Sequence, residues 1–229
     1  MLIGGLQKTT LVDYPGKIAA TIFTIGCNYR CSYCHNPEIV KGIAKVISEK
    51  QVLDFLKTRQ DLLDAVCITG GEPTLQGDLT EFIKKVKDLG YAIKLDTNGY
   101  KPLVLKKLLD AELLDYVAMD IKGTWRKYEK VVNIKGMDVE KIKRSVALLK
   151  EGQVPYEFRS TLLPAFHTPK DIVAMARQIK GADKYFLQQF RPAESLVDPD
   201  YLGAMTYTKK QLNEIVQEFK DWFKVCRVR

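Results

Sequence analysis

Three of the five cysteines of this chain lie within eight residues, between Cys27 and Cys34. Their spacing is Cys-x-x-x-Cys-x-x-Cys, and an apolar run rich in β-branched residues, from 18 to 25, comes directly before them. Such a run predicts a buried strand, so the cysteines are expected on a loop at its C-terminal end. Thiolates gathered on one loop are typical ligands of an iron–sulfur cluster or of zinc.

The number of clustered cysteines favours a cluster over a zinc ion. A structural zinc site is normally closed by four ligands, whereas Cys67 and Cys226 stand alone and far from the triplet. His35 directly follows Cys34, and adjacent residues rarely converge on one metal ion. Three thiolates on a [4Fe–4S] cluster leave one iron free to bind an external molecule. Zinc and metal-free thiols remain the alternatives.

Length and composition set the general class of the protein. The chain has 229 residues, of which 46% are hydrophobic and 28% charged, as expected for one globular domain. No apolar run reaches the ~18 residues of a membrane helix, and no secretory signal is recognised at the N-terminus. The unpaired, clustered cysteines argue against a disulfide framework. We therefore expect a cytoplasmic protein without a membrane segment.

The formal net charge is +8, which raises the question of a nucleic-acid partner. The lysines are spread over expected helices, and no basic stripe alternates with aromatic residues. This pattern indicates solvated helix faces rather than a nucleic-acid surface. We expect the positive surface to help an acidic electron donor, such as a flavodoxin or ferredoxin, to dock.

Six strand-like runs alternate with six amphipathic helical stretches along the chain. The expected strands are 18–25, 65–69, 91–96, 116–121, 156–162 and 185–190, and the expected helices are 48–58, 78–89, 102–111, 138–150, 168–179 and 208–224. Ser48 and Asp78 are placed to cap the first two helices, and Pro169 to open the fifth. Such alternation predicts an α/β fold with parallel strands and outer helices. Six units are fewer than the eight of a closed barrel, so we expect a partial (β/α)6 TIM-like barrel.

The whole of 1–229 is expected to form one domain, with a cysteine loop at 26–36 and a C-terminal helical segment at about 206–229. Folds of this kind place their active sites at the C-terminal ends of the strands. Polar motifs follow the strands at those points: Thr69-Gly70-Gly71-Glu72-Pro73, Asp96-Thr97-Asn98-Gly99, Asp120-Ile121-Lys122, Arg159 within the fifth strand, and Gln189 with Arg191 at the sixth. These motifs also have purely structural interpretations. The glycine-containing motifs are typical of turns. Asp120 and Lys122 could form an ion pair with each other, and Arg159 could form one with a nearby carboxylate.

The segment Cys27-x-x-x-Cys31-x-Tyr33-Cys34 resembles the signature of radical S-adenosylmethionine (SAM) enzymes. Cys34-His35-Asn36 is similar to the activating enzymes of glycyl radical enzymes, and the resemblance runs from about Gly4 to Pro192. Within that group the chain most resembles the longer activating proteins of anaerobic ribonucleoside-triphosphate reductase. It resembles the activating enzyme of pyruvate formate-lyase more distantly.

The resemblance implies a cofactor set and a reaction. One [4Fe–4S] cluster on Cys27, Cys31 and Cys34 would bind SAM and cleave it reductively to a 5′-deoxyadenosyl radical. That radical would abstract a hydrogen from the α-carbon of a glycine in a partner, such as anaerobic ribonucleotide reductase. The resemblance also implies an oxidoreductase that works under anaerobic conditions.

The resemblance assigns roles to the polar motifs as well. Tyr33 would pack near the adenine of SAM, and the backbone of His35 would contact its edge. The expected contacts of the rest of SAM are Gly70, Gly71, Glu72, Asp96, Thr97, Asn98, Asp120, Lys122 and Arg159, with Gln189 and Arg191 as weaker candidates. Lys122 would also face the incoming peptide, which makes it a catalytic candidate. Asp96, Thr97 and Asp120 would coordinate a monovalent cation.

One motif departs from the pattern of the activating enzymes. Asp13-Tyr14-Pro15-Gly16 resembles their Asp-Gly-Pro-Gly loop, but Tyr14 stands where glycine is usual. The departure bears on the choice of partner and not on the resemblance to radical SAM enzymes. The alternatives are a small-molecule radical SAM enzyme similar to carboxy-deazaguanine synthase, and a non-catalytic iron–sulfur or zinc protein.

Overall fold

The strands follow one another across a single open sheet in the order in which they occur in the chain. The computed structural model describes residues 1–229, and its eight-stranded sheet has the order β1-β2-β3-β4-β5-β6-β7-β8. The strands are β1 (Ile3–Thr10), β2 (Ala19–Thr24), β3 (Ala65–Gly70), β4 (Ala92–Thr97), β5 (Tyr116–Asp120), β6 (Tyr156–Leu162), β7 (Lys184–Gln189) and β8 (Val225–Val228). β1 is antiparallel to β2, and all later neighbours are parallel.

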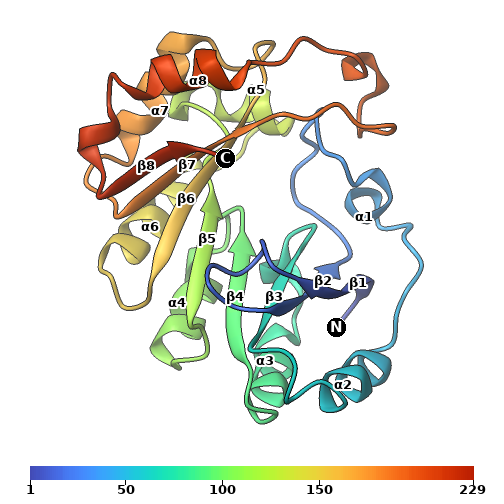
Figure 1. The fold of residues 1–229 in the computed structure, drawn as a ribbon. Helices are drawn as coiled ribbons and strands as arrows, with labels where there is room; N and C mark the ends of the chain where they lie inside the picture. Colours follow the sequence, from blue (N-terminus) through green and yellow to red (C-terminus); the bar gives the residue numbers. More distant parts are fainter.

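Helices connect the parallel strands and lie on the outer side of the curved sheet (Figure 1). They are α1 (Pro37–Lys41), α2 (Glu49–Lys57), α3 (Leu79–Lys87), α4 (Pro102–Asp110), α5 (Tyr128–Val132), α6 (Val139–Lys150), α7 (Pro169–Gln178) and α8 (Lys209–Val216). β1 and β8 stand at opposite ends of the arc and do not pair. The predicted α/β fold, a partial barrel with parallel strands and outer helices, is confirmed.

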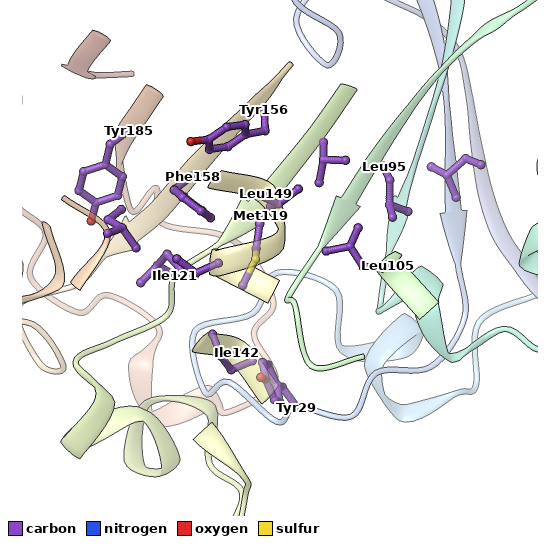
Figure 2. Close-up of a cluster of buried hydrophobic side chains, with 14 of the residues drawn as sticks. Tyr29, Leu95, Leu105, Met119, Ile121, Ile142, Leu149, Tyr156, Phe158 and Tyr185 are labelled. Atoms are coloured by element: carbon purple, nitrogen blue, oxygen red, sulfur yellow. The ribbon is translucent and has the colours of Figure 1, made fainter. Parts of the chain in front are cut away.

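The outer face of the sheet carries the main core. Successive side chains of a strand point to opposite faces, and most residues of β4 to β6 that point toward the helices are apolar and buried. Leu95, Met119 and Phe158 pack there against Leu105 of α4 and Leu149 of α6 (Figure 2). The other residues of these strands are free to be polar, which leaves the inner face available for a site.

Both edge strands were missed in the sequence. β1 contains two adjacent glycines and several polar residues, and β8 has only four residues, so neither shows a strong apolar alternation. Each depends on hydrogen bonds to the strand beside it, β1 to β2 and β8 to β7. Pairing of this kind is a tertiary property that a local pattern does not report.

The C-terminal segment differs from the helix expected at 208–224 and the helical segment at about 206–229. α8 ends at Val216, a single 3-10 turn follows at Lys220–Trp222, and the chain then enters β8. Phe219 and Phe223 both pack against Tyr185 of β7, with ring centroids 6.2 and 5.3 Å away. Placing both rings on one tyrosine turns the chain back toward the sheet.

Helix capping agrees with the sequence at two of three positions. Ser48 forms a capping box and Pro169 begins α7 directly after Thr168, which forms another capping box, whereas the Asp78 side chain makes no capping hydrogen bond. The Asp78 carboxylate pairs instead with the amino group of Met1. None of the helices combines the length and the apolar character that a bilayer-spanning helix requires.

Candidate active site

A cavity of about 220 Å³ opens where the strands end at their carboxyl sides. Its wall unites the cysteine loop with the polar motifs that follow β3, β4 and β5. The lining residues are Cys27, Tyr29, Cys31, Tyr33, Cys34, His35, Asn36, Val40, Thr69, Gly70, Gly71, Glu72, Asp96, Thr97, Asn98, Asp120, Lys122, Arg159 and Thr161. The tertiary structure thus brings most of the expected site residues to one place.

The cysteine loop is held in place by backbone hydrogen bonds on both sides. The amide of Gly26 donates to the carbonyl of Ile39 at 2.8 Å, and the carbonyl of Gly26 accepts from the amide of Glu72 at 2.9 Å. At the far end, the carbonyl of Cys34 accepts from the amide of Val197 at 3.0 Å. These bonds are independent of side-chain identity, so they set the path of the loop before any ligand binds.

The three thiols suit a metal cluster. All are free, and they are the only cysteines that line the cavity. Burial raises the pKa of Cys27 to about 12 and that of Cys31 to about 11, so neither ionises without a cationic partner. Iron bound to the sulfurs supplies such a partner, because metal binding displaces the thiol protons. The donors present therefore fit the predicted [4Fe–4S] cluster.

Aromatic residues of the same loop tie the cavity to the core. Tyr33 packs against Phe166 and Phe190, with ring centroids 5.4 and 6.3 Å away, and His35 packs on Phe190 at 5.2 Å. Tyr29 lies in the main core near Ile142 of α6 (Figure 2). The hydroxyls of Tyr29 and Tyr33 are buried without a hydrogen-bond partner. Buried polar groups normally have partners, so these two are consistent with a ligand that completes the cavity.

The two glycines after β3 are required by contacts within the protein. A Cβ on Gly71 would lie 1.9 Å from the carbonyl oxygen of Gly26, and one on Gly70 would lie 2.3 Å from the amide nitrogen of Thr24. Gly70 also has a φ of +113°, which other residues rarely adopt. The resemblance implied that these glycines contact SAM. Gly71 first makes room for the cysteine loop, and Gly70 for the end of β2, although both also line the cavity.

Glu72 connects the loop after β3 to the loop after β4 by hydrogen bonds. Its carboxylate is fully buried and accepts hydrogen bonds from the hydroxyl of Thr97 at 2.6 Å and the amide of Asn98 at 2.7 Å. It also accepts from the amide and the hydroxyl of Thr74. Burial raises its pKa, while these donors oppose the change. Because its oxygens are engaged by the protein, Glu72 acts by positioning the loops and not through a free carboxylate.

A network of charged side chains lies beside the thiols. Arg159 bridges two carboxylates, with Nη1 2.9 Å from Asp96 and Nε 3.0 Å from Asp120. Lys122 lies 3.0 Å from Asp120, and Lys94 pairs with Asp96. Burial alone would raise the pKa of both carboxyls, but Arg159 and the lysines lower it, to about 2 at Asp120. The ion pairs that the sequence left open are therefore formed.

Two expected site residues lie outside the cavity. Arg191 is exposed, and neither it nor Gln189 lines the cavity. Their neighbour Gln188 lines the second cavity, and its amide oxygen accepts a hydrogen bond from Thr161, a residue of the first cavity, at 3.4 Å. Strand alternation turns Gln188 to the inner face, so the expectation was displaced by one residue.

Residues that the sequence did not single out complete the site. Lys94 follows the same alternation as Asp96, which could have revealed it. His167 lies in the loop between β6 and α7, and its Nε2 donates to the carbonyl of Lys122 at 2.8 Å. Its Nδ1 accepts from the amide of Leu163 at 3.2 Å, which leaves the ring proton on Nε2. His167 therefore fixes the backbone that carries Lys122.

A second cavity of about 200 Å³ lies on the inner face and shares Arg159 with the first. Its wall is almost entirely polar and includes the loop between β1 and β2. The lining residues are Val12, Asp13, Pro15, Lys94, Glu157, Arg159, Gln188 and Arg229. Arg229 closes one side through a two-pronged ion pair with Glu157, at 2.9 and 3.0 Å. The inner face is thus hollow and charged beyond the cysteine loop.

Comparison with known proteins points to one family. A sequence model of the Radical SAM superfamily matches residues 21–186. A Methanocaldococcus jannaschii protein named "Putative glycyl-radical enzyme activating enzyme" is 36% identical over 221 residues, which cover 93% of this chain and 90% of that protein.

Solved structures agree with this at the level of the fold. Streptococcus suis SuiB bound to S-adenosylmethionine matches 90% of this chain with a TM-score of 0.69 and 12% identity, and this chain spans 48% of SuiB. A domain of pyruvate-formate lyase-activating enzyme from Bacteroides vulgatus matches 72% of this chain and 99% of that domain, with a TM-score of 0.54 and 16% identity. From the family match and the motif at its cavity, this chain belongs to the radical SAM superfamily.

Proposed function

We propose that this protein activates a glycyl radical enzyme, with anaerobic ribonucleoside-triphosphate reductase as the partner. The observation that carries the proposal is the cavity itself, where three free thiols face the polar ends of β3, β4 and β5. The name of the methanogen relative, which matches nearly the full chain, supports the activase assignment. Membership of the superfamily implies a [4Fe–4S] cluster and SAM.

The residues that line the cavity have different proposed roles. Cys27, Cys31 and Cys34 would hold the cluster, which when bound supplies the electron that cleaves SAM to methionine and a 5′-deoxyadenosyl radical. The Tyr33 ring would pack against the adenine. The charged pair Asp120 and Lys122 would orient the methionine end of SAM.

The second cavity offers a route for the glycine-bearing segment of the partner. It is lined by Asp13 and Pro15, the loop that resembles the Asp-Gly-Pro-Gly loop of activating enzymes. Arg159 lines both cavities and pairs with Asp120, which is also the partner of Lys122. A glycine suits the reaction because it has no side chain to block the α-hydrogen, and flanking amides stabilise its radical.

The proposal is tested in two stages under anaerobic conditions. Reconstituted protein with dithionite and SAM should form 5′-deoxyadenosine, and the Cys31→Ala variant should not. Addition of the candidate reductase should then give a glycyl radical doublet in electron paramagnetic resonance. No 5′-deoxyadenosine would refute radical SAM catalysis. Product without a glycyl radical in any such partner would favour a small-molecule substrate.

We propose further that an acidic flavodoxin or ferredoxin reduces the cluster in the cytoplasm. The net charge of +8 supports electrostatic docking, and the five free cysteines support a reducing compartment. Reduction rates should fall as salt screens the encounter. A rate that is insensitive to ionic strength would refute this mode of docking.

A further inference from the structure

Three side-chain cations surround the two carboxylates at the ends of β4 and β5. Lys94 is 2% exposed, pairs with Asp96, and has its Nζ 3.8 Å from the sulfur of Cys67. Arg159 reaches both Asp96 and Asp120, and Lys122 pairs with Asp120. The set therefore holds three positive and two negative charges.

This arrangement disagrees with the monovalent cation that the sequence placed at Asp96, Thr97 and Asp120. The Thr97 hydroxyl donates to Glu72 at 2.6 Å and accepts from the amide of Gly99 at 3.1 Å, so it is already engaged. Both carboxylates are already paired with cations of the protein. A further cation would have to enter beside groups of its own charge, which disfavours its binding.

We propose that Lys94, together with Arg159, supplies from the chain itself the positive charge expected of a bound monovalent cation. SAM binding would then need neither Na⁺ nor K⁺. The inference rests on the proposed function only in that SAM occupies the cavity. Lys94 lines the second cavity and not the first, so it acts on the ligand through Asp96 and is a positioning residue.

The charge count explains why a built-in cation suits this site. Arg159 and Lys122 line the cavity that must accept the carboxylate of SAM, and Lys94 pairs with Asp96 from the side of the second cavity. Asp96 and Asp120 stay ionised at neutral pH, because the nearby cations lower the pKa of both against the effect of burial. A lysine tethered to β4 holds its charge beside Asp96 at any salt concentration, whereas a free ion binds according to its concentration.

The experiment measures SAM affinity by equilibrium dialysis of the cluster-loaded protein at constant ionic strength. Choline chloride, NaCl and KCl are compared. The affinity of the wild-type protein should agree within about twofold in the three salts. Lys94→Ala removes the charge and leaves space beside Asp96, so it should bind SAM about tenfold more weakly in choline chloride. In NaCl or KCl a free cation can take the place of the lysine, and the SAM affinity should return to that of the wild type.

Two further variants separate charge from shape. Lys94→Arg keeps the charge and should retain affinity that is independent of the salt. Lys106→Ala removes an exposed lysine that pairs with Asp110 on α4, and should behave as the wild type. Iron content and circular dichroism establish that each variant is folded and loaded. If Lys94→Ala does not fold, Lys94→Ser, which also removes the charge and leaves space, takes its place, and the wild-type comparison stands by itself.

The outcomes are distinct. Wild-type affinity that rises several-fold with K⁺ or Na⁺ would overturn the inference and leave the proposed function intact. A folded Lys94→Ala protein that is equally weak in all three salts would also overturn it, because a structural role alone predicts that result. Failure of the loaded wild-type protein to bind SAM in any salt would overturn the proposed function and the inference together.

Discussion

The outer and inner faces of the sheet carry opposite chemistry, although the same strands build both. On β6, Phe158 is buried beneath the helices, and its neighbour Arg159 joins two carboxylates on the inner face. On β4, Leu95 likewise lies in the core beneath the helices, and its neighbour Asp96 pairs with Arg159 on the inner face. The outer face is apolar and supplies stability, whereas the inner face is charged and hollow. Strand alternation thus lets one sheet serve as core and as binding site.

Charged residues persist on the inner face because each finds a partner. A buried ion is costly unless opposite charges and hydrogen bonds surround it. Arg159, Lys94 and Lys122 meet this condition through Asp96 and Asp120. Changes on the two faces should therefore have different consequences, for folding on the outer face and for ligand binding on the inner one.

The largest effect is expected at the cysteine loop. Cys31→Ala removes one of three cluster ligands and should abolish iron incorporation and 5′-deoxyadenosine formation, while the sheet remains folded. Iron analysis, product chromatography and circular dichroism measure the three properties. Cys226→Ala, a cysteine outside the cavity, is the matched control. Full iron content in Cys31→Ala would show that this thiol is not a ligand.

A core change on the outer face should mainly affect folding. Phe158→Ala leaves a cavity beneath the helices and should lower the free energy of unfolding by about 3–5 kcal/mol. Anaerobic urea unfolding measures this, and SAM affinity of the protein that remains folded should change little. A loss below about 1 kcal/mol would mean that this face contributes less than the buried surface indicates.

Glu72 links stability to the site and should show both effects. Glu72→Gln turns an acceptor of several hydrogen bonds into a group that must place its own NH₂ near Thr97 and Asn98. The free energy of unfolding should fall by about 2–3 kcal/mol, and SAM affinity should fall as well. Glu81→Gln, at an exposed position on α3, is the control. An unchanged free energy of unfolding would rule out a structural role of Glu72 in connecting the two loops.

On the inner face, Asp120→Ala should affect the ligand and spare the cluster. The change releases Lys122 and Arg159 from their shared partner. SAM affinity should fall about tenfold, which corresponds to about 1.4 kcal/mol. Binding by equilibrium dialysis and iron content are measured on the same sample. Equal affinity in variant and wild type would refute the role of Asp120 in orienting SAM.

The smallest effect concerns the pH dependence of stability through His167. Burial lowers its pKa below the ordinary value of 6.5, so the unfolded chain binds the proton more readily. Its contribution is present above about pH 6.5 and is lost as pH falls below that value. Between about pH 7.5 and 5.5 the wild type should lose more stability than His167→Gln. Lys122 and Asp171 act on the same ring, so parallel curves for the two proteins would exclude His167 as the titrating group.

Local patterns in the sequence predicted a large part of this molecule. The cysteine triplet, the strand-and-helix alternation and the polar residues after each strand all depend on neighbours in the chain. They were sufficient for an open α/β fold with a site at the strand ends. The edge strand β8 was mistaken for helix, because its pairing with β7 is invisible in a four-residue run.

The sequence by itself determined which residue types gather at the mouth of the sheet, since strand alternation and strand ends are set locally. Only the tertiary structure decided their partners: that Arg159 meets Asp96 and Asp120, that Lys94 joins them, and that Glu72 braces Thr97. The reason is that ion pairs and hydrogen bonds depend on distances across neighbouring strands. Those distances exist only once the strands lie side by side.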